Sequence, residues 1–164
     1  MNDMSRIKPH KISLAVQYAS NSRHVPNRAQ LRRWISAALK HDARITLRIV
    51  DELEGRKLNN DYRGKNYATN VLTFVYDDCM TQPLSANLDQ LCGDVVICAP
   101  VVEQEAAAQH KELLAHYAHL IIHAALHLQG YDHEDEKDAA AMESLETALM
   151  LKLRYPDPYQ ATRH

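Results

Sequence analysis

Three histidines in one short stretch, His123, His127 and His133, constrain this chain more than any other feature of its sequence. The first two are four residues apart, so on a helix with 3.6 residues per turn their side chains lie on one face. Gly130 follows three residues later, and glycine readily adopts the positive φ that ends a helix and reverses the chain. The reversal would bring in His133, and three nitrogen ligands leave one position on a tetrahedral zinc ion open for water. The stretch therefore predicts a helix, a turn and a catalytic site for one zinc ion per chain.

Two alternatives remain open from these residues alone. The ligand spacing equals that of the metzincin peptidases, which carry a glutamate directly after the first histidine as general base. Ala124 occupies that position here, and its methyl group cannot accept a proton, so a metallopeptidase-like hydrolase is the weaker reading. The other alternative is a histidine-rich helix that binds no metal, because ten histidines in one chain make chance pairs common.

Length and composition indicate one folded domain. A chain of 164 residues that is 46% hydrophobic and 24% charged is long enough for one core and short for two. We therefore expect a single domain over residues 1–164, with residues 155–164 as a loose tail. The sequence has no run of 18 apolar residues and no apolar signal core, so we expect a cytoplasmic protein with no membrane partner. Three cysteines without a C-x-x-C pair are typical of reduced thiols.

Charge is distributed unevenly along the chain. Residues 1–70 carry 14 Lys and Arg against 6 Asp and Glu, a net charge of +8. Residues 71–164 carry 5 against 15, a net charge of −10. A basic half beside a metal-bearing half favours a polyanionic partner such as a nucleic acid. The alternative is that the two sets of charges interleave in space as solvated faces.

Hydrophobic periodicity divides the chain into strands and helices. Alternating apolar residues predict strands at residues 10–18, 44–52, 71–76 and 91–98. Spacings of three and four predict helices over about 27–40, 53–61, 100–109 and 112–129, and a last helix from an acidic run at 132–138 to about 155. Asn27 and Gln30 form a capping-box pattern for the first helix. On the last helix we expect a buried stripe of Ala141, Leu145, Ala148 and Leu149. Together the elements indicate one α+β domain: a small mixed sheet of about four strands packed against helices, with the metal-bearing helix central.

Arg63 is the residue outside the histidine stretch with the clearest chemical role. It lies in a predicted polar loop, residues 62–70, near Lys65. A guanidinium binds phosphate oxygens bidentately and stays charged, so beside a metal it would hold a scissile phosphate and stabilise the transition state. Lys65 and Asn70 are candidates for contacting RNA, although the Asn70 side chain would equally close a turn within the loop.

Two further residues are candidates for supporting the metal ligands. His119 lies one turn before His123 on the same helix face, and we expect it to support the ligands because one metal position must stay open for water. Asp132 would cap the last helix or hold a ligand imidazole through its second nitrogen, and we expect the cap. No side chain in the sequence is assigned as the general base.

These motifs resemble those of the YbeY family, bacterial endoribonucleases and ribosomal-RNA maturation factors. The resemblance spans about residues 45–159 and includes the segments 58–65, 69–72, 93–97, 123–133 and 155–159. Three departures lie in or near the Arg63 loop: Asn66 stands for the family's usual Asp, and Ala68 and Val75 for its usual Pro. Ala124 stands for its usual Gly.

The resemblance implies a function and a set of partners. The resemblance implies that His123, His127 and His133 bind zinc and that Arg63 matches the family's functionally important arginine. It implies cleavage of single-stranded RNA in small-subunit ribosomal-RNA processing and ribosome quality control. Implied partners are ribosomal RNA, the small ribosomal subunit, a ribosome-assembly GTPase and a small-subunit ribosomal protein. The alternative to an enzyme is a non-catalytic ribosome-assembly factor in which zinc only stabilises the fold.

Overall fold

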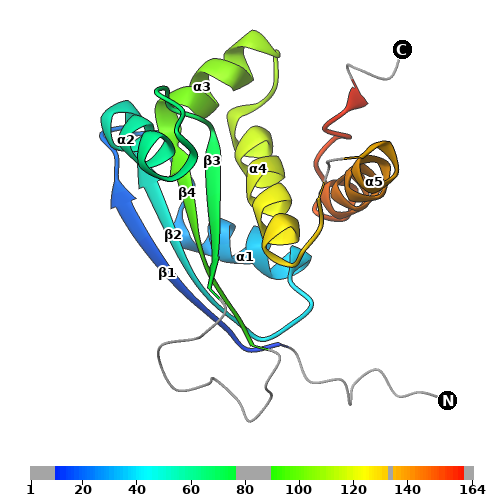
Figure 1. Cartoon of the computed structure of the whole chain (residues 1–164). Helices are drawn as coiled ribbons and strands as arrows, with labels where there is room; N and C mark the ends of the chain where they lie inside the picture. Colours follow the sequence, from blue (N-terminus) through cyan, green and yellow to red (C-terminus); the bar gives the residue numbers. More distant parts are fainter. Residues whose placement is uncertain (1–9, 77–89, 133–134, 161–164) are drawn as a thin grey trace, which may run out of the picture.

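A computed structural model describes residues 10–76, 90–132 and 135–160 of the chain (Figure 1). Within these residues it has four strands and five helices. The strands are β1 (Ile12–Ala19), β2 (Ala43–Val50), β3 (Val71–Tyr76) and β4 (Leu91–Cys98). The helices are α1 (Arg28–Ala38), α2 (Glu52–Arg63), α3 (Ala99–Ala108), α4 (Leu113–Leu128) and α5 (Glu136–Lys152).

The four strands form one mixed sheet in the order β1-β2-β4-β3. β1, β2 and β4 are parallel to one another, whereas β3 runs antiparallel to β4 and lies at an edge. β2 alternates buried and half-buried residues, as expected of a strand covered unequally on its two faces. The prediction of a single α+β domain with a small mixed sheet of about four strands is confirmed.

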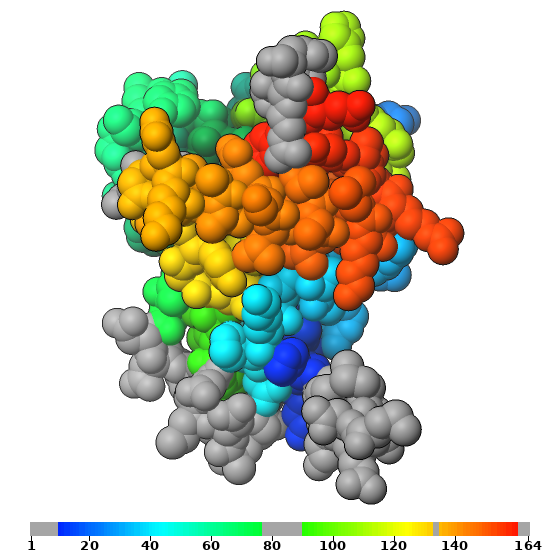
Figure 2. All heavy atoms as spheres, turned by 90° about the vertical axis from the view of Figure 1, so that its right-hand side faces the viewer, coloured from blue at the N-terminus to red at the C-terminus, as the bar shows by residue number. Residues whose placement is uncertain are grey.

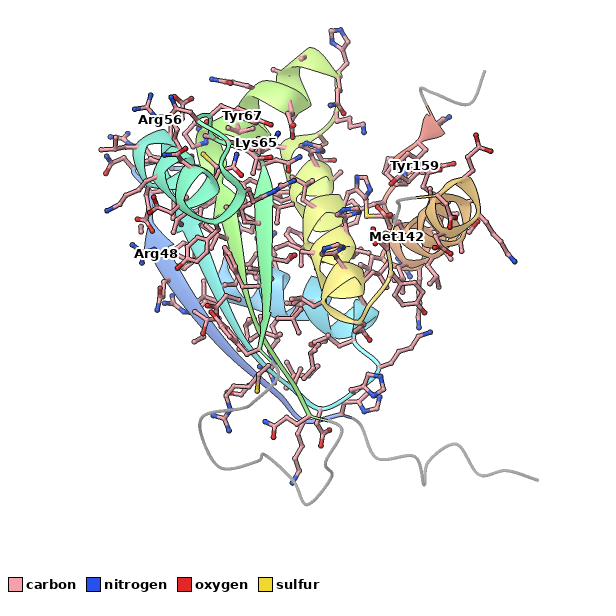
Figure 3. All side chains as sticks on the ribbon, viewed as in Figure 1. Arg48, Arg56, Lys65, Tyr67, Met142 and Tyr159 are labelled. Atoms are coloured by element: carbon pink, nitrogen blue, oxygen red, sulfur yellow. The ribbon has the colours of Figure 1, made fainter. Side chains whose placement is uncertain are left out.

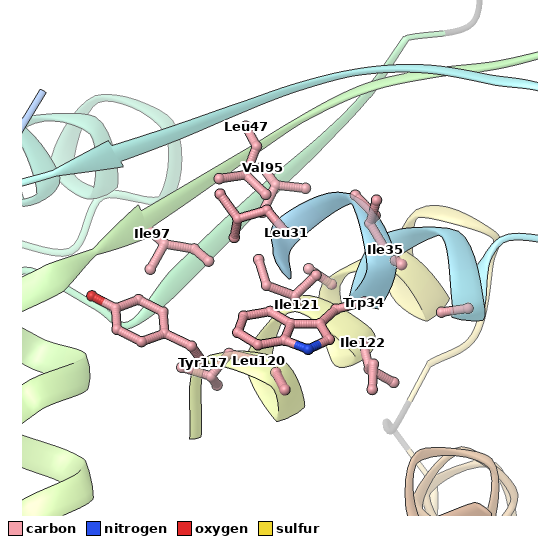
Figure 4. Packing of buried hydrophobic residues seen from close by; sticks show 14 of the residues in the cluster. Leu31, Trp34, Ile35, Leu47, Val95, Ile97, Tyr117, Leu120, Ile121 and Ile122 are labelled. Atoms are coloured by element: carbon pink, nitrogen blue, oxygen red, sulfur yellow. The ribbon is translucent and has the colours of Figure 1, made fainter. Parts of the chain in front are cut away.

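Helices cover both faces of the sheet. One face packs against α1 and α4, where Trp34 and Tyr117 are fully buried beneath Leu47 and Ile97 (Figure 4). A smaller cluster on the other face joins Leu72 of β3 to residues of α2 and α3. α5 lies outside α4, and Figure 2 shows α5 and the C-terminal segment forming the surface over that helix.

α4 is the central helix, as the sequence predicted for the histidine-bearing segment. Eleven of its residues are buried, because the sheet and α1 cover one side of the helix and α5 covers another. A helix that is apolar around most of its circumference is a buried helix. His123 and His127 lie on the part of α4 that remains half-buried.

The helix ends confirm one predicted cap and correct another. Gln30 donates its backbone N–H to the Asn27 side chain at 2.8 Å, and the Gln30 side chain accepts from the Asn27 N–H at 2.9 Å, so the capping box is present. The cap of α5 is Asp135, whose side chain accepts from the backbone N–H of Asp138 at 2.7 Å. The prediction that Asp132 caps this helix is therefore wrong.

α2 is longer than predicted, and this changes the setting of Arg63. The helix continues through Asp61 to Arg63 and ends at Gly64, which adopts φ +69 and donates its backbone N–H to the Asn60 carbonyl. Only glycine takes this left-handed conformation without a steric cost, so Gly64 sets the end of the helix. Arg63 is consequently the last residue of a helix and not a loop residue.

Two further expectations differ from the structure. The buried residues of α5 are Met142, Glu146 and Met150. Of the predicted stripe, Leu145 and Leu149 are partly buried against the core, whereas Ala141 and Ala148 are exposed. Residues 155–160, expected as a loose tail, pack against the domain, with the Tyr155 ring 6.2 Å from that of Trp34. Residues 161–164 lie outside the described residues.

Two expectations from composition remain, the reduced state of the cysteines and the absence of a membrane-spanning helix. Cys98 is free and buried, as expected, but Cys92 is disulfide-bonded, which contradicts the expectation of reduced thiols for that residue. Among the described residues, no helix combines the length and the apolar character that crossing a bilayer requires.

Candidate active site

A cavity of about 670 Å³ lies where α2, β3, α4 and the C-terminal segment meet. Its lining contains five of the residues that the sequence singled out: Arg63 and Asn70 from one side, and His119, His123 and His127 from α4. Arg63 is 60 positions before His123 in the chain, so only the fold brings them to one cavity. Lys65 and Asp132 do not line it.

His123 and His127 present parallel rings to this cavity. Their ring centroids are 6.5 Å apart and the ring planes differ by 5°. This is the geometry that the spacing of four residues predicts for one face of a helix. Among the described residues, no three His, Cys, Asp or Glu side chains are placed so that together they could hold a metal ion. His133, the third predicted ligand, lies outside the described residues.

The Glu146 side chain of α5 contacts the same face of α4. Glu146 is 1% exposed, and its Oε1 lies 2.5 Å from His119 Nε2 and 3.3 Å from His123 Nδ1. The Tyr159 hydroxyl donates to the same oxygen at 2.8 Å. Tyr159 lies in the C-terminal segment, and Met142, one turn before Glu146, points toward α4 (Figure 3). A buried carboxylate on α5 therefore joins two histidines of α4 to the C-terminal segment.

These contacts keep Glu146 ionised. Burial by itself would raise the pKa of this carboxyl group, because a charged group is costly to remove from water. Hydrogen bonds with His119 and His123, and the positive charge of those rings whenever they are protonated, outweigh burial and lower the pKa of Glu146 to about 2. An ionised carboxylate only accepts hydrogen bonds, so it selects the His123 tautomer with the hydrogen on Nδ1 and the lone pair on Nε2.

This tautomer is the one that metal binding through Nε2 requires. Metal-ligating histidines commonly donate their other ring N–H to a carboxylate, which fixes the ring orientation and raises the basicity of the ligand. His123 and His127, with Glu146 behind His123, are therefore two nitrogen donors of the kind that zinc accepts. His119, whose Nε2 contacts Glu146, lies where a residue that supports the ligands is expected.

Sequence reasoning missed Glu146 and Tyr159, although one signal for Glu146 was present. Met142, Glu146 and Met150 recur every four residues, so they share one face of α5. A glutamate between two methionines on a buried face requires a polar partner, because an unpaired buried charge is costly. Tyr159 carried no comparable signal, since its role depends on a segment that looked like a loose tail.

Arg63 lies opposite the histidines and is held by the end of α2. Its side chain is exposed and lines the cavity. The turn after it is fixed by Asn59, which is fully buried and donates its side-chain amide to the Tyr67 carbonyl at 2.8 Å. Lys65 is exposed in this turn and donates its backbone N–H to the Asn59 carbonyl. The backbone thus orients Arg63 and leaves its guanidinium accessible.

Asn70 has a structural task at the margin of the cavity. Its side-chain amide donates to Glu105 Oε1 at 3.1 Å, and its side-chain oxygen accepts the backbone N–H of Val71. Glu105 in turn contacts Nε2 of the buried His116 at 2.9 Å. Burial opposes ionisation of Glu105, but its hydrogen bonds with His116 and Asn70 outweigh burial and lower its pKa. Asn70 therefore connects the start of β3 to α3 and α4.

Comparisons of the sequence with known proteins point to one family. A family described as Endoribonuclease YbeY matches residues 15–154. Endoribonuclease YbeY of Nitrosospira multiformis is 55% identical over 161 residues, covering 94% of this chain and 85% of that protein. The protein of the same name from Methylobacillus flagellatus is 52% identical, covering 93% of this chain and 97% of its own length. The solution structure of TM1509 from Thermotoga maritima shares the fold with a TM-score of 0.51 and 21% identity, covering 87% of this chain and 91% of that one.

Proposed function

The chain belongs to the YbeY family of endoribonucleases, and we propose that it is a zinc-dependent endoribonuclease that cleaves single-stranded RNA. Its substrate would be ribosomal RNA of the small subunit, during late maturation and ribosome quality control. The observation that supports the proposal is the single cavity that Arg63, His123 and His127 line together. A cationic phosphate ligand next to a pair of metal-ligating side chains is suited to phosphodiester cleavage.

The histidine side of the cavity would hold the metal. His123 and His127, with His133 as third ligand, would bind one zinc ion per chain. When bound, zinc supplies Lewis-acid chemistry toward a phosphate oxygen or a water molecule. Glu146 holds the His123 ring in the required tautomer, and His119 and Tyr159 hold Glu146. This arrangement fixes the orientation of His123 before any metal arrives.

Arg63 would bind the phosphate. Its guanidinium offers a planar fork of N–H donors that matches two phosphate oxygens and stays protonated at every relevant pH. Because the charge on the phosphate grows in the transition state, a fixed cation stabilises that state more than the bound substrate. Lys65 and other cations of the basic N-terminal half would attract the RNA backbone.

The proposed partners follow from the same reading. Ribosomal RNA in the small subunit is the proposed substrate, in the cytoplasm, and a ribosome-assembly GTPase and a small-subunit ribosomal protein are the proposed protein partners. The alternative function is that of an assembly factor in which zinc stabilises the fold without taking part in cleavage. It differs in one consequence: Arg63 would then be dispensable for RNA processing.

Zinc content and RNA cleavage, measured on the same preparations, test the proposal. The variants are His127→Ala and, as a matched control, His24→Ala, which removes an exposed histidine that does not line the cavity. We expect about one zinc per chain and cleavage of single-stranded RNA for wild type and His24→Ala. His127→Ala should keep its circular dichroism spectrum and lose both. A wild-type chain that binds no zinc after reconstitution, or that cleaves RNA equally well without it, would overturn the proposal.

A further inference from the structure

Tyr62 is an aromatic residue that is unusually exposed for its type. It precedes Arg63 on the last turn of α2, lines the cavity, and is 67% exposed. A tyrosine in a folded domain usually buries most of its ring, because an aromatic side chain offers a large apolar surface. At this position most of that surface is in contact with solvent, directly beside the proposed phosphate ligand.

The Tyr62 ring is nevertheless held in place. It meets the ring of Phe74 at a centroid distance of 4.9 Å and an interplanar angle of 64°, which is an edge-to-face arrangement. Phe74 lies on the edge strand β3 and packs against the cluster that includes Leu72 and Val96. Phe74 thus joins Tyr62 to the core at one side of the ring and leaves the rest accessible.

Exposed cations lie on the same helix and turn as Tyr62. Arg56, Lys57, Arg63 and Lys65 are all exposed, on α2 and the turn that follows it. Figure 3 shows Arg56 and Lys65 at α2 and the turn that follows it. Exposed cations together with an accessible aromatic ring are the combination by which proteins bind single-stranded nucleic acid: the cations follow the backbone and the ring stacks on a base.

We propose that Tyr62 is the platform for one unpaired nucleobase of the RNA, while Arg63 binds a phosphate of the same strand. The inference rests on the proposed function and adds a nucleobase subsite to it. In a duplex the faces of each base are covered by its neighbours, so the base would first have to leave the stack, which costs free energy. An unpaired base offers its face without that cost. Tyr62 would therefore determine the preference for single strands, and it would accept any base, since every base has a π face.

Three variants separate stacking from other roles of the side chain. Tyr62→Ala removes the ring, and Tyr62→Leu keeps apolar bulk without a π face. Tyr62→Phe keeps the ring and removes the hydroxyl group. Tyr67→Ala is the matched control, because Tyr67 is 58% exposed in the segment following α2 and does not line the cavity.

The probe is a short single-stranded RNA that carries 2-aminopurine, a base whose fluorescence falls when it stacks. This RNA is mixed with the full zinc-loaded chain, and its fluorescence is recorded before turnover. We expect fluorescence quenching with wild type, Tyr62→Phe and Tyr67→Ala. For Tyr62→Ala and Tyr62→Leu we expect no quenching and a Kd for single strands raised about 5- to 100-fold, the usual contribution of one stacked base. The Kd for the matching duplex should change little, so the preference for single strands should narrow.

The outcomes distinguish a failure of this inference from a failure of the proposed function. If wild type binds and cleaves the RNA but Tyr62→Ala binds and quenches like wild type, the nucleobase subsite is refuted and the proposed function stands. The nucleobase subsite is also refuted, and the proposed function also stands, if Tyr62→Ala and Tyr67→Ala weaken RNA binding equally. If wild type neither binds nor cleaves single-stranded RNA, the proposed function fails, and the subsite fails with it.

Discussion

The two sides of the cavity are built in opposite ways. On the histidine side, the buried Glu146 connects His119, His123 and Tyr159, so three segments of the chain meet at one carboxylate. On the arginine side, Tyr62 and Arg63 are exposed, and the backbone at the end of α2 sets their positions. On the first side a buried carboxylate pairs with neighbouring side chains, whereas the second side presents its side chains to solvent.

This difference matches the demands of the two proposed ligands. A metal ion is small and needs its ligands fixed in a narrow geometry, which buried hydrogen bonds provide. A single strand of RNA is flexible and large, and exposed cations and rings can adjust to it. Substitutions on the histidine side should therefore change metal affinity and stability, while those on the arginine side should change RNA binding and turnover.

The largest effect on metal affinity is expected from Glu146→Gln. The amide keeps the size of the side chain but loses the charge that selects the His123 tautomer. We expect zinc affinity to fall about 10- to 100-fold, the usual cost of losing such a partner of a ligand. Competition with a chromophoric chelator measures this affinity directly. Glu143→Gln, on the exposed face of the same helix, should leave it unchanged, and equal losses in both variants would contradict the role assigned to Glu146.

A smaller effect, on stability alone, is expected from Glu105→Gln. The carboxylate of Glu105 pairs with His116 and Asn70, and its pKa is lowered from 4.5. We expect a loss of about 1 kcal/mol in the free energy of unfolding near neutral pH, with zinc content unchanged.

The pH dependence of that loss follows from the direction of the pKa shift. A lowered pKa in the folded state contributes stability above the unfolded pKa and loses it as the pH falls through the folded value. The difference between wild type and Glu105→Gln in urea unfolding should therefore shrink below about pH 4.5. A difference that is constant from pH 7 to pH 3 would show that the ionised carboxylate is not its source.

The smallest effect is expected from Lys65→Ala. Lys65 is exposed and lies outside the cavity lining, so its contribution is long-range attraction of the RNA backbone. We expect a weaker RNA affinity, by only a few-fold, and a slope of log Kd against log salt reduced by about 1. Titrations at several salt concentrations measure both quantities. An unchanged slope would remove Lys65 from the RNA path, and loss of bound zinc would contradict the separation of the two sides.

Local sequence patterns were sufficient for part of this architecture. The spacing of His123 and His127 placed both on one face of a central helix, and the pairing of Asn27 with Gln30 identified the start of α1. Such features depend on residues within one or two turns of each other, so periodicity and capping chemistry determine them. The mixed four-stranded sheet also followed from the order of the elements.

The contacts between distant segments did not follow from local patterns. Glu146 contacts His119 across 27 positions, and Tyr159 contacts His119 across 40, so no window of sequence contains both partners. The prediction ended α2 at Asp61 because the polar segment after it indicates a loop, whereas the helix continues to Arg63 and ends at the left-handed Gly64. Asp132 was chosen as a cap from an acidic run in which Asp135 has the correct geometry.

The most direct test of the two-sided account is the Arg63→Ala variant, with bound zinc and the rate of RNA cleavage measured on one preparation. The account predicts about one zinc per chain, an unchanged unfolding midpoint, and cleavage slowed about 100- to 1,000-fold, as for loss of one transition-state ligand. Full zinc with undiminished cleavage would contradict it and favour the non-catalytic assembly factor. Loss of zinc would show that the two sides of the cavity are not separate.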